Sequence, residues 1–369
     1  MPAGHPVSRS RNEDFGTLSL QRVAAAIAER AAGLDEAGTF PVADIDELRR
    51  AGLLRLFARS LESDALDLTR TLRSIGRANL SVGRIYEGHV NGAKLVAWYG
   101  TAAQNRQLEA EIDAGHVFAV WATESPPGVA MHRDGGGWRL EGAKSFATGA
   151  GHVDSALITA RLPDQRKQLL WMRLGGESGR DDASAWRVRG MRATVSGTFD
   201  FTGMRVTDDD RVGEPGAYEQ EPRFTAGAWR FTAVQLGGVE ALLMLLRDHL
   251  RTSGADKDPI HRARFGQAVI SARNAALWVD KAAVMAEALD PNSIPLTLMT
   301  RGVVEDAGLL LMDTVARTMG TRAFFTRQPA DRIARDLGLY LRQAMPDQAR
   351  DRAASAWLEE DRWRDDLLW

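Results

Sequence analysis

The hydrophobic pattern in the first third of the chain is helical. In "LQRVAAAIAERAAGL" and "FPVADIDELRRAGLLRL" apolar residues recur every three or four positions, the spacing of one helix face. Pro41 and Asp44 open the second of these segments in the manner of a helix start. We therefore expect a disordered lead over residues 1–16 and an α-helical domain over residues 17–117.

From residue 118 the pattern changes to alternation of apolar and polar positions, which is the period of a β-strand. Six short runs rich in β-formers follow, separated by Gly, Asp and Pro: "VFAVWATE", "GWRLEGAKSFAT", "SALITARL", "QLLWMRL", "WRVRGM" and "GTFDFTGMRV". Such closely spaced short strands predict a compact antiparallel barrel or sandwich over residues 118–215.

Helical periodicity returns in the last part of the chain. Four long amphipathic segments, which begin near residues 231, 259, 298 and 329, are joined by short loops. This pattern predicts a four-helix bundle over residues 216–369, and the charged "WLEEDRWRDDLLW" is expected to be a helical tail that docks on the bundle or on a partner subunit. Helices, then strands, then helices indicate an α+β fold with segregated layers.

The composition narrows the possible chemistry. A formal net charge of −2 and a pI near 6.4 argue against a broad nucleic-acid surface, which needs a basic excess. The chain has no cysteine, so disulfides, thiolate metal sites and thiol nucleophiles are excluded. Neither a membrane-length apolar run nor the apolar core of a secretory signal is evident. We expect a cytoplasmic protein with no metal, nucleic-acid or membrane partner.

Five segments, in order along the chain, resemble motifs of the acyl-CoA dehydrogenase superfamily: "DEAGTFPVADIDELRRAGLLRL", "AVWATESPPG", "WRLEGAKSFATGA", "GMRATVSGTFDFTGMRV" and "RIARDLGLY". The likeness covers nearly the whole chain. It implies an acyl-CoA dehydrogenase-like α+β fold with an N-terminal helical domain, a central antiparallel β domain and a C-terminal four-helix bundle.

The resemblance also implies FAD, bound between the β domain and the bundle. Carried over to this sequence, Ala122 and Thr123 would meet the pyrimidine edge of the flavin. Phe146 would stand where the family has a tryptophan against the ring, and Thr148 would reach the N5 region. A flavin needs such an apolar face and a few fixed hydrogen bonds to the atoms whose charge changes on reduction.

The cofactor of this family usually lies across a subunit interface. Arg251 lies where the family keeps an arginine for the FAD pyrophosphate of the neighbouring subunit, and Gly320 matches part of its glycine loop. The resemblance therefore implies a homodimer or a homotetramer.

The catalytic base of the family is missing. Most members place a glutamate shortly after the Arg-Asp pair of "RIARDLGLY", and that position is Ala344 here. Other members place the base on the first helix of the bundle, where this chain has Trp229. Asp347 and Glu124 are the carboxylates nearby in sequence that we consider as substitutes.

Three functions remain open. The first is an FAD-dependent oxidoreductase acting on a small molecule, an acyl thioester being one option, with an electron-transfer partner. The second is a flavin monooxygenase of the same fold that takes reduced flavin from a reductase partner; His89 is the candidate for the histidine that such enzymes often keep near the ring. The third is a non-catalytic scaffold paralogue. In either enzyme, Trp121, Trp229 and Arg230 are expected to line the substrate pocket.

Overall fold

The computed structural model describes residues 11–57, 64–343 and 345–359. The N-terminal layer is helical, with the bounds α1 Arg11–Ala37, α2 Val42–Arg50, α3 Leu53–Leu56, α4 Ala65–Ala78, α5 Leu80–Tyr99 and α6 Ala102–Asp113. Helix α1 begins inside the segment that we predicted to be a disordered lead, so the last residues of that segment are helical.

Side-chain caps explain where three of these helices begin. Asp64 accepts a hydrogen bond from the backbone N–H of Leu66 at the start of α4, and Thr101 forms a reciprocal capping box with Gln104 at the start of α6. Asn79 ends α4 and caps α5, accepting from the N–H of Ser81 at 2.9 Å. These polar residues satisfy N–H groups that have no partner inside the helix. The cap at Asn79 therefore fixes the start of α5, the helix that packs against the β domain.

The β domain contains two sheets. The larger runs β10-β6-β5-β2-β3-β9 with β1 beside β5, and the smaller runs β4-β8-β7. The strands are β1 Phe118–Trp121, β2 Ala130–Asp134, β3 Gly137–Glu141, β4 Ala143–Ala147, β5 Ser155–Arg161, β6 Lys167–Arg173, β7 Asp181–Asp182, β8 Gly197–Asp200, β9 Arg205–Val206 and β10 Arg211–Val212. Most pairs are antiparallel, as expected for the domain, but β1 pairs with β5 in parallel over its whole length, and β2 meets β5 in parallel at Ala130.

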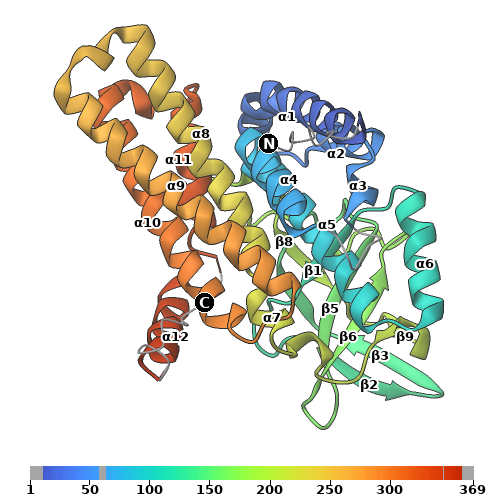
Figure 1. Cartoon of the computed structure of the whole chain (residues 1–369). Helices are drawn as coiled ribbons and strands as arrows, with labels where there is room; N and C mark the ends of the chain where they lie inside the picture. Colours follow the sequence, from blue (N-terminus) through green and yellow to red (C-terminus); the bar gives the residue numbers. More distant parts are fainter. Residues whose placement is uncertain (1–10, 58–63, 344, 360–369) are drawn as a thin grey trace.

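The C-terminal part is dominated by three long helices, α8 Trp229–Ser253, α9 Pro259–Glu287 and α10 Ser293–Met319. Their upper ends project beyond the rest of the chain (Figure 1). The fourth predicted helix is shorter than expected: α11 covers Pro329–Tyr340, and α12 begins separately at Pro346 and runs to Leu358. Proline at the first position of α12 suits a helix start and ends the preceding turn. Most of the predicted tail lies outside the described residues.

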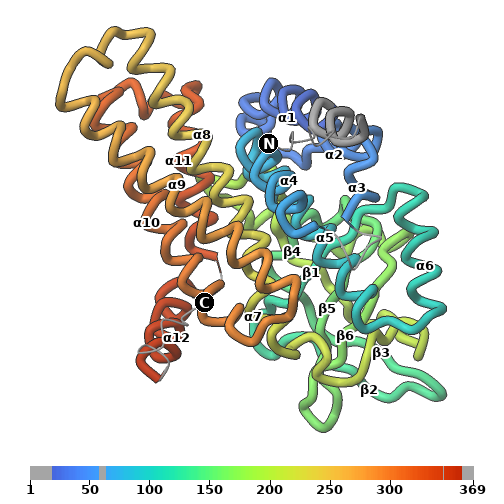
Figure 2. Tube along the Cα trace, in the orientation of Figure 1, coloured from blue at the N-terminus to red at the C-terminus, as the bar shows by residue number. Residues whose placement is uncertain are grey.

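Helix α8 is the central helix of the molecule. A methyl group on Gly237 would lie 2.4 Å from the carbonyl oxygen of Arg73, and one on Gly76 would lie 2.4 Å from the carbonyl oxygen of Val234. The backbones of α4 and α8 therefore meet directly, and α5 packs on both α8 and β1, so the N-terminal helices contact the bundle as well as the β domain (Figure 2). The stretch Arg223–Ser253 is apolar and long enough to span a membrane, but 72% of its apolar window is buried inside the protein, as a central helix requires.

Candidate functional site

The end of the predicted flavin hairpin is held by buried polar groups. Trp121, at the end of β1, donates its indole N–H to the carbonyl oxygen of Thr148 at 3.0 Å. The hydroxyl of Thr148 lies 3.0 Å from that of Ser196, which in turn lies 2.8 Å from that of Thr194. All four side chains are buried. The structure thus brings Trp121 and Thr148 together, and adds Ser196, which we did not single out in the sequence.

Phe146, in contrast to these buried residues, is exposed to solvent. Its side chain is 62% exposed, and its φ of 53° lies in the left-handed region that bulky residues avoid. The ring contacts Trp186 edge-on, with 6.3 Å between the ring centroids. A strained and exposed aromatic residue of this kind is typical of a ligand-binding surface, because the bound ligand would cover the ring.

Ala122 and Thr123 continue from β1 along the edge of the hairpin. The carbonyl oxygen of Thr123 accepts from the N–H of Ser145 at 3.0 Å, and the Thr123 side chain is exposed. The next residue, Glu124, forms an ion pair with the buried Lys144 and accepts from the N–H of Val129. Burial lowers the pKa of Lys144 against the opposing effect of Glu124. Glu124 is therefore held as the counter-ion of a buried cation.

Trp229 and Arg230, at the start of α8, meet a carboxylate that we did not predict from the sequence. Glu287, the last residue of α9, accepts from Arg230 at 2.7 Å, from Lys94 at 2.9 Å and from the Trp229 indole at 3.2 Å. Burial raises the pKa of Glu287, but the charges of Arg230 and Lys94 outweigh burial and hold the pKa below its ordinary value. Glu287 is thus a fixed anion and a weak base.

The charged network continues along α5. Arg230 donates to the side-chain oxygen of Asn91 at 2.5 Å, Asn91 donates to Glu87, and Glu87 forms an ion pair with Arg84. Arg84, Glu87, Asn91 and Lys94 are spaced by three or four residues and so share one face of α5. This polar stripe on an otherwise apolar helix is a signal that the sequence contains and that we did not use.

The network reaches the hairpin through Arg84. A cavity of about 10 Å³ is lined by both Arg84 and Thr148. Tyr340 of α11 is buried, and its hydroxyl has no hydrogen-bond partner in the part of the chain that the structure describes. Burial, and after it the charge of Glu87, raise the pKa of Tyr340 well above its ordinary value, against the opposing effect of Arg84. Tyr340 therefore keeps its proton, and its hydroxyl is a buried donor that no described residue accepts from.

His89 lies on α5 but presents no free nitrogen. Its Nε2 lies 2.7 Å from the carbonyl oxygen of Leu54, and its Nδ1 accepts from the N–H of Phe118 at 3.2 Å. The first contact requires a proton on Nε2 and the second a lone pair on Nδ1, so the ring is neutral. Burial lowers the pKa of His89 from 6.5 to about 4. This geometry supports a structural role for His89 in joining α3, α5 and β1, in place of the catalytic role that we considered.

Because the folded protein resists protonation of His89, we expect this residue to weaken stability in mild acid. Between pH 6.5 and 4 the unfolded chain binds a proton at His89 that the folded chain does not, so folding loses up to ~3 kcal/mol as the pH falls through this window. Denaturant unfolding of the wild type and of His89→Gln across this range measures the effect. The difference between their unfolding free energies should shrink as the pH falls, and parallel profiles would contradict the assignment.

The remaining predicted residues lie apart from the hairpin. Arg251 is exposed near the end of α8, and Gly320, with a φ of 61°, follows α10 with open space around it. Both belong to the projecting end of the bundle (Figure 1). Asp347 is exposed in the first turn of α12. Ala344, the position of the usual base, lies outside the described residues.

Comparison with known proteins agrees with this architecture. No protein-family model matches the chain. Dibenzothiophene monooxygenase of Rhodococcus erythropolis is 25% identical over 364 residues, spanning 82% of this chain and 83% of that protein. The crystal structure of an FMN-bound enzyme of Paenibacillus sp. A11-2, also a dibenzothiophene monooxygenase, superposes with a TM-score of 0.83 at 19% identity, covering 93% of this chain and 97% of that one.

Butyryl-CoA dehydrogenase of Megasphaera elsdenii superposes with a TM-score of 0.84 at 16% identity, covering 96% of this chain and all of that one. The same fold thus occurs in monooxygenases and in acyl-CoA dehydrogenases. The chain thus has the acyl-CoA dehydrogenase-like fold, and the ordered motifs together with these likenesses support a divergent member of that superfamily.

Proposed function

We propose that the chain is a flavin-dependent monooxygenase that uses reduced flavin to insert oxygen into a small organic molecule. The likeness to the Rhodococcus monooxygenase over 82% of the chain supports this choice within the superfamily. From the sequence we expected FAD, but the FMN in the related Paenibacillus crystal makes FMN the first nucleotide to test.

One observation favours a monooxygenase over a dehydrogenase: in the described part of the chain, the carboxylates of the α5 network and Glu124 beside the hairpin are not free to act as a base. A dehydrogenase needs a carboxylate that is free to take the α-proton of a thioester. Among the described residues near the hairpin and α5, Glu287, Glu87 and Glu124 are each held by a cation. The alternative base position is Trp229, which is fully buried.

The residues present fit a flavin. Phe146 and Trp186 would offer an aromatic surface to the ring, and Ala122, Thr123 and Thr148, at the strand ends, would hydrogen-bond its edge. Reduced flavin would supply the electrons that activate dioxygen. Arg84 lines a cavity of about 10 Å³ beside Thr148, which holds no more than a water molecule, and its charge acts on the buried hydroxyl of Tyr340.

The role of Phe146 gives a direct prediction. Replacing Phe146 by glycine removes the aromatic surface and should weaken flavin binding about tenfold. The same change relieves the left-handed backbone, so the thermal midpoint of the flavin-free protein should not fall. Fluorescence titration with FMN and thermal unfolding measure the two effects. Leu277→Ala, a similarly exposed apolar position on α9, is the control and should alter neither.

An anaerobic titration separates the two reaction classes. We expect that flavin-loaded protein, mixed without oxygen with acyl-CoA thioesters from four to twelve carbons, stays oxidised at its visible absorbance maximum, because Glu287, Glu87 and Glu124 are each held by a cation. Bleaching of the flavin by a thioester would identify a dehydrogenase and overturn the proposal. Protein that binds neither FMN nor FAD would favour the scaffold alternative.

We also propose that the enzyme works as a homo-oligomer. Arg251 and Gly320 lie in the projecting end of the bundle, and the β domain that carries the hairpin lies at the other side of the molecule (Figure 1). A second copy is therefore needed if Arg251 is to reach a flavin at Phe146. Light scattering of the purified protein tests this arrangement, and a monomer at micromolar concentration would contradict it.

A further inference from the structure

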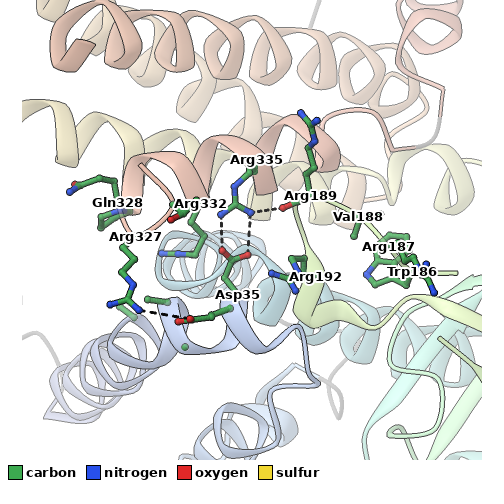
Figure 3. A pocket seen from close by; sticks show the side chains of 16 residues that line it. Asp35, Trp186, Arg187, Val188, Arg189, Arg192, Arg327, Gln328, Arg332 and Arg335 are labelled. Carbon is green, nitrogen blue, oxygen red and sulfur yellow. Dashed lines mark hydrogen bonds and ion pairs between the residues drawn. The ribbon is translucent and has the colours of Figure 1, made fainter. Parts of the chain in front are cut away.

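An arginine-rich pocket lies next to the hairpin, where its lining residue Trp186 contacts Phe146. Its volume is about 1080 Å³, and its walls come from the end of α1, the segment 186–192 and the start of α11. Six arginines and two carboxylates line it: Arg187, Arg189, Arg192, Arg327, Arg332 and Arg335, with Asp35 and Glu36. Figure 3 shows Trp186 and Arg187 on one side and Arg327 and Gln328 on the other.

The walls of this pocket are fixed by hydrogen bonds between its segments. Arg335 forms an ion pair with Asp35 at 2.7 Å and donates to the carbonyl oxygen of Arg189 (Figure 3). The N–H of Met191 donates to Asp336 at 2.6 Å. A methyl group on Gly190 would lie 2.0 Å from the carbonyl oxygen of Arg335, so the segment 186–192 packs directly on the backbone of α11. These contacts hold the segment 186–192 against α11.

The pocket has more positive charge than its own carboxylates neutralise. Arg335 is paired with Asp35, Arg332 lies 3.8 Å from Asp336, and Arg327 lies 3.9 Å from Glu36. In the described part of the chain, Arg187, Arg189 and Arg192 have no carboxylate partner. Arg192 is half-buried, and its guanidinium group lies against Gly38. A partly desolvated arginine without a counter-ion favours binding of an anion.

Two further features of the pocket indicate which kind of anion it would bind. Helix α11 has twelve residues, and its N-cap Gln328, which lines the pocket, makes no side-chain cap hydrogen bond. The positive end of the helix therefore lies at the pocket, and the one carboxylate of its first turn, Asp331, is paired with Arg335 at 2.8 Å, an arrangement that leaves the helix start open to a phosphate. The half-buried ring of Trp186 adds an aromatic surface, and a volume of this size accommodates a nucleotide.

We propose that this pocket binds the phosphate group of a nucleotide, with Arg192 and Arg187 as its principal ligands. Planar guanidinium groups match the oxygens of a phosphate, and Trp186 supports the ring system attached to it. The nucleotide is either a flavin nucleotide, whose ring then lies near Phe146, or a separate adenine nucleotide. The flavin case rests on the function proposed above, and the adenine case does not.

Binding measured with four probes tests the proposal. FMN, riboflavin, AMP and inorganic phosphate are titrated into the wild type, Arg192→Gln, Arg187→Gln and the control Arg317→Gln, which lies on an exposed face of α10. We expect a phosphate-bearing probe to lose about tenfold in affinity in each pocket variant, because a charge-assisted hydrogen bond is lost. Riboflavin should bind equally to all four proteins. Thermal midpoints verify that the variants are folded.

The outcomes distinguish the two nucleotides that could supply the bound phosphate. If FMN binds more tightly than riboflavin and the difference disappears in Arg192→Gln, the ligand is the flavin phosphate. If AMP binds, depends on Arg192 and does not compete with riboflavin, a separate nucleotide site is established. Equal affinity of every probe for the wild type and both pocket variants would overturn the proposal. If no flavin binds at all, the proposed function fails, while AMP and phosphate still test this pocket.

Discussion

Replacing Glu287 by glutamine should lower the free energy of unfolding by about 3–5 kcal/mol. Glu287 is the shared counter-ion of Lys94 and Arg230, whose side chains are only 1% and 5% exposed. Glutamine keeps the size of the side chain but leaves two buried cations without a negative charge, and their desolvation is then uncompensated. Denaturant unfolding followed by circular dichroism gives the free energy directly.

A double variant isolates the charge effect. Adding Lys94→Met to Glu287→Gln removes one of the two unpaired cations, so the double variant should be more stable than the sum of the single changes predicts. Asp313→Asn is the matched control, because it breaks an exposed ion pair with Arg317 and should leave the unfolding midpoint unchanged. Additive effects of Glu287→Gln and Lys94→Met would show that the buried pair is not coupled.

Replacing Glu124 by glutamine should cost ~3 kcal/mol and also weaken flavin binding. Lys144 is fully buried, and its ammonium group has Glu124 and the hydroxyl of Thr159 as partners. Glutamine leaves that cation unpaired in the core of the β domain. Glu124 also holds the N–H of Val129, so the loop between β1 and β2 loses an anchor next to Thr123.

Removing the cation of this pair, in place of the carboxylate, should destabilise the protein much less. Lys144→Met removes the buried cation and leaves Glu124, which is 22% exposed and so remains partly solvated; a loss of about 1 kcal/mol or less is expected. Unfolding curves and FMN titration of both variants test the asymmetry. Equal losses of unfolding free energy from the two changes would mean that the ion pair is as well solvated as a surface pair. Glu124 would then be available as a base.

Much of the fold was predictable because its signals are local. The change from helical to alternating periodicity located the β domain, and the hairpin motif located Phe146 and Thr148. The parallel pairing of β1 with β5 was not predictable, because alternation specifies which face is buried but not the direction of a neighbouring strand. The early end of α11 at Tyr340 was likewise hidden by apolar residues that continue the helical spacing as far as Pro346.

The chemistry of the site depends on contacts between distant segments. Lys94 and Glu287 are 193 residues apart, and nothing near Glu287 in the sequence marks its role. His89 looked available because the sequence does not show the backbone groups of Leu54 and Phe118 that occupy its two nitrogens. The arginines of the pocket come from two segments that only the fold brings together.

The origin of the oxygen atom in the product tests the proposed function most directly. Protein loaded with chemically reduced FMN is mixed with ¹⁸O-labelled dioxygen and a panel of sulfur- and nitrogen-containing aromatic compounds, and the products are analysed by mass spectrometry. A flavin monooxygenase should yield a product that carries one ¹⁸O atom, formed only when both the protein and the reduced flavin are present. A product that contains no label, or a thioester oxidised without oxygen incorporation, would contradict the assignment.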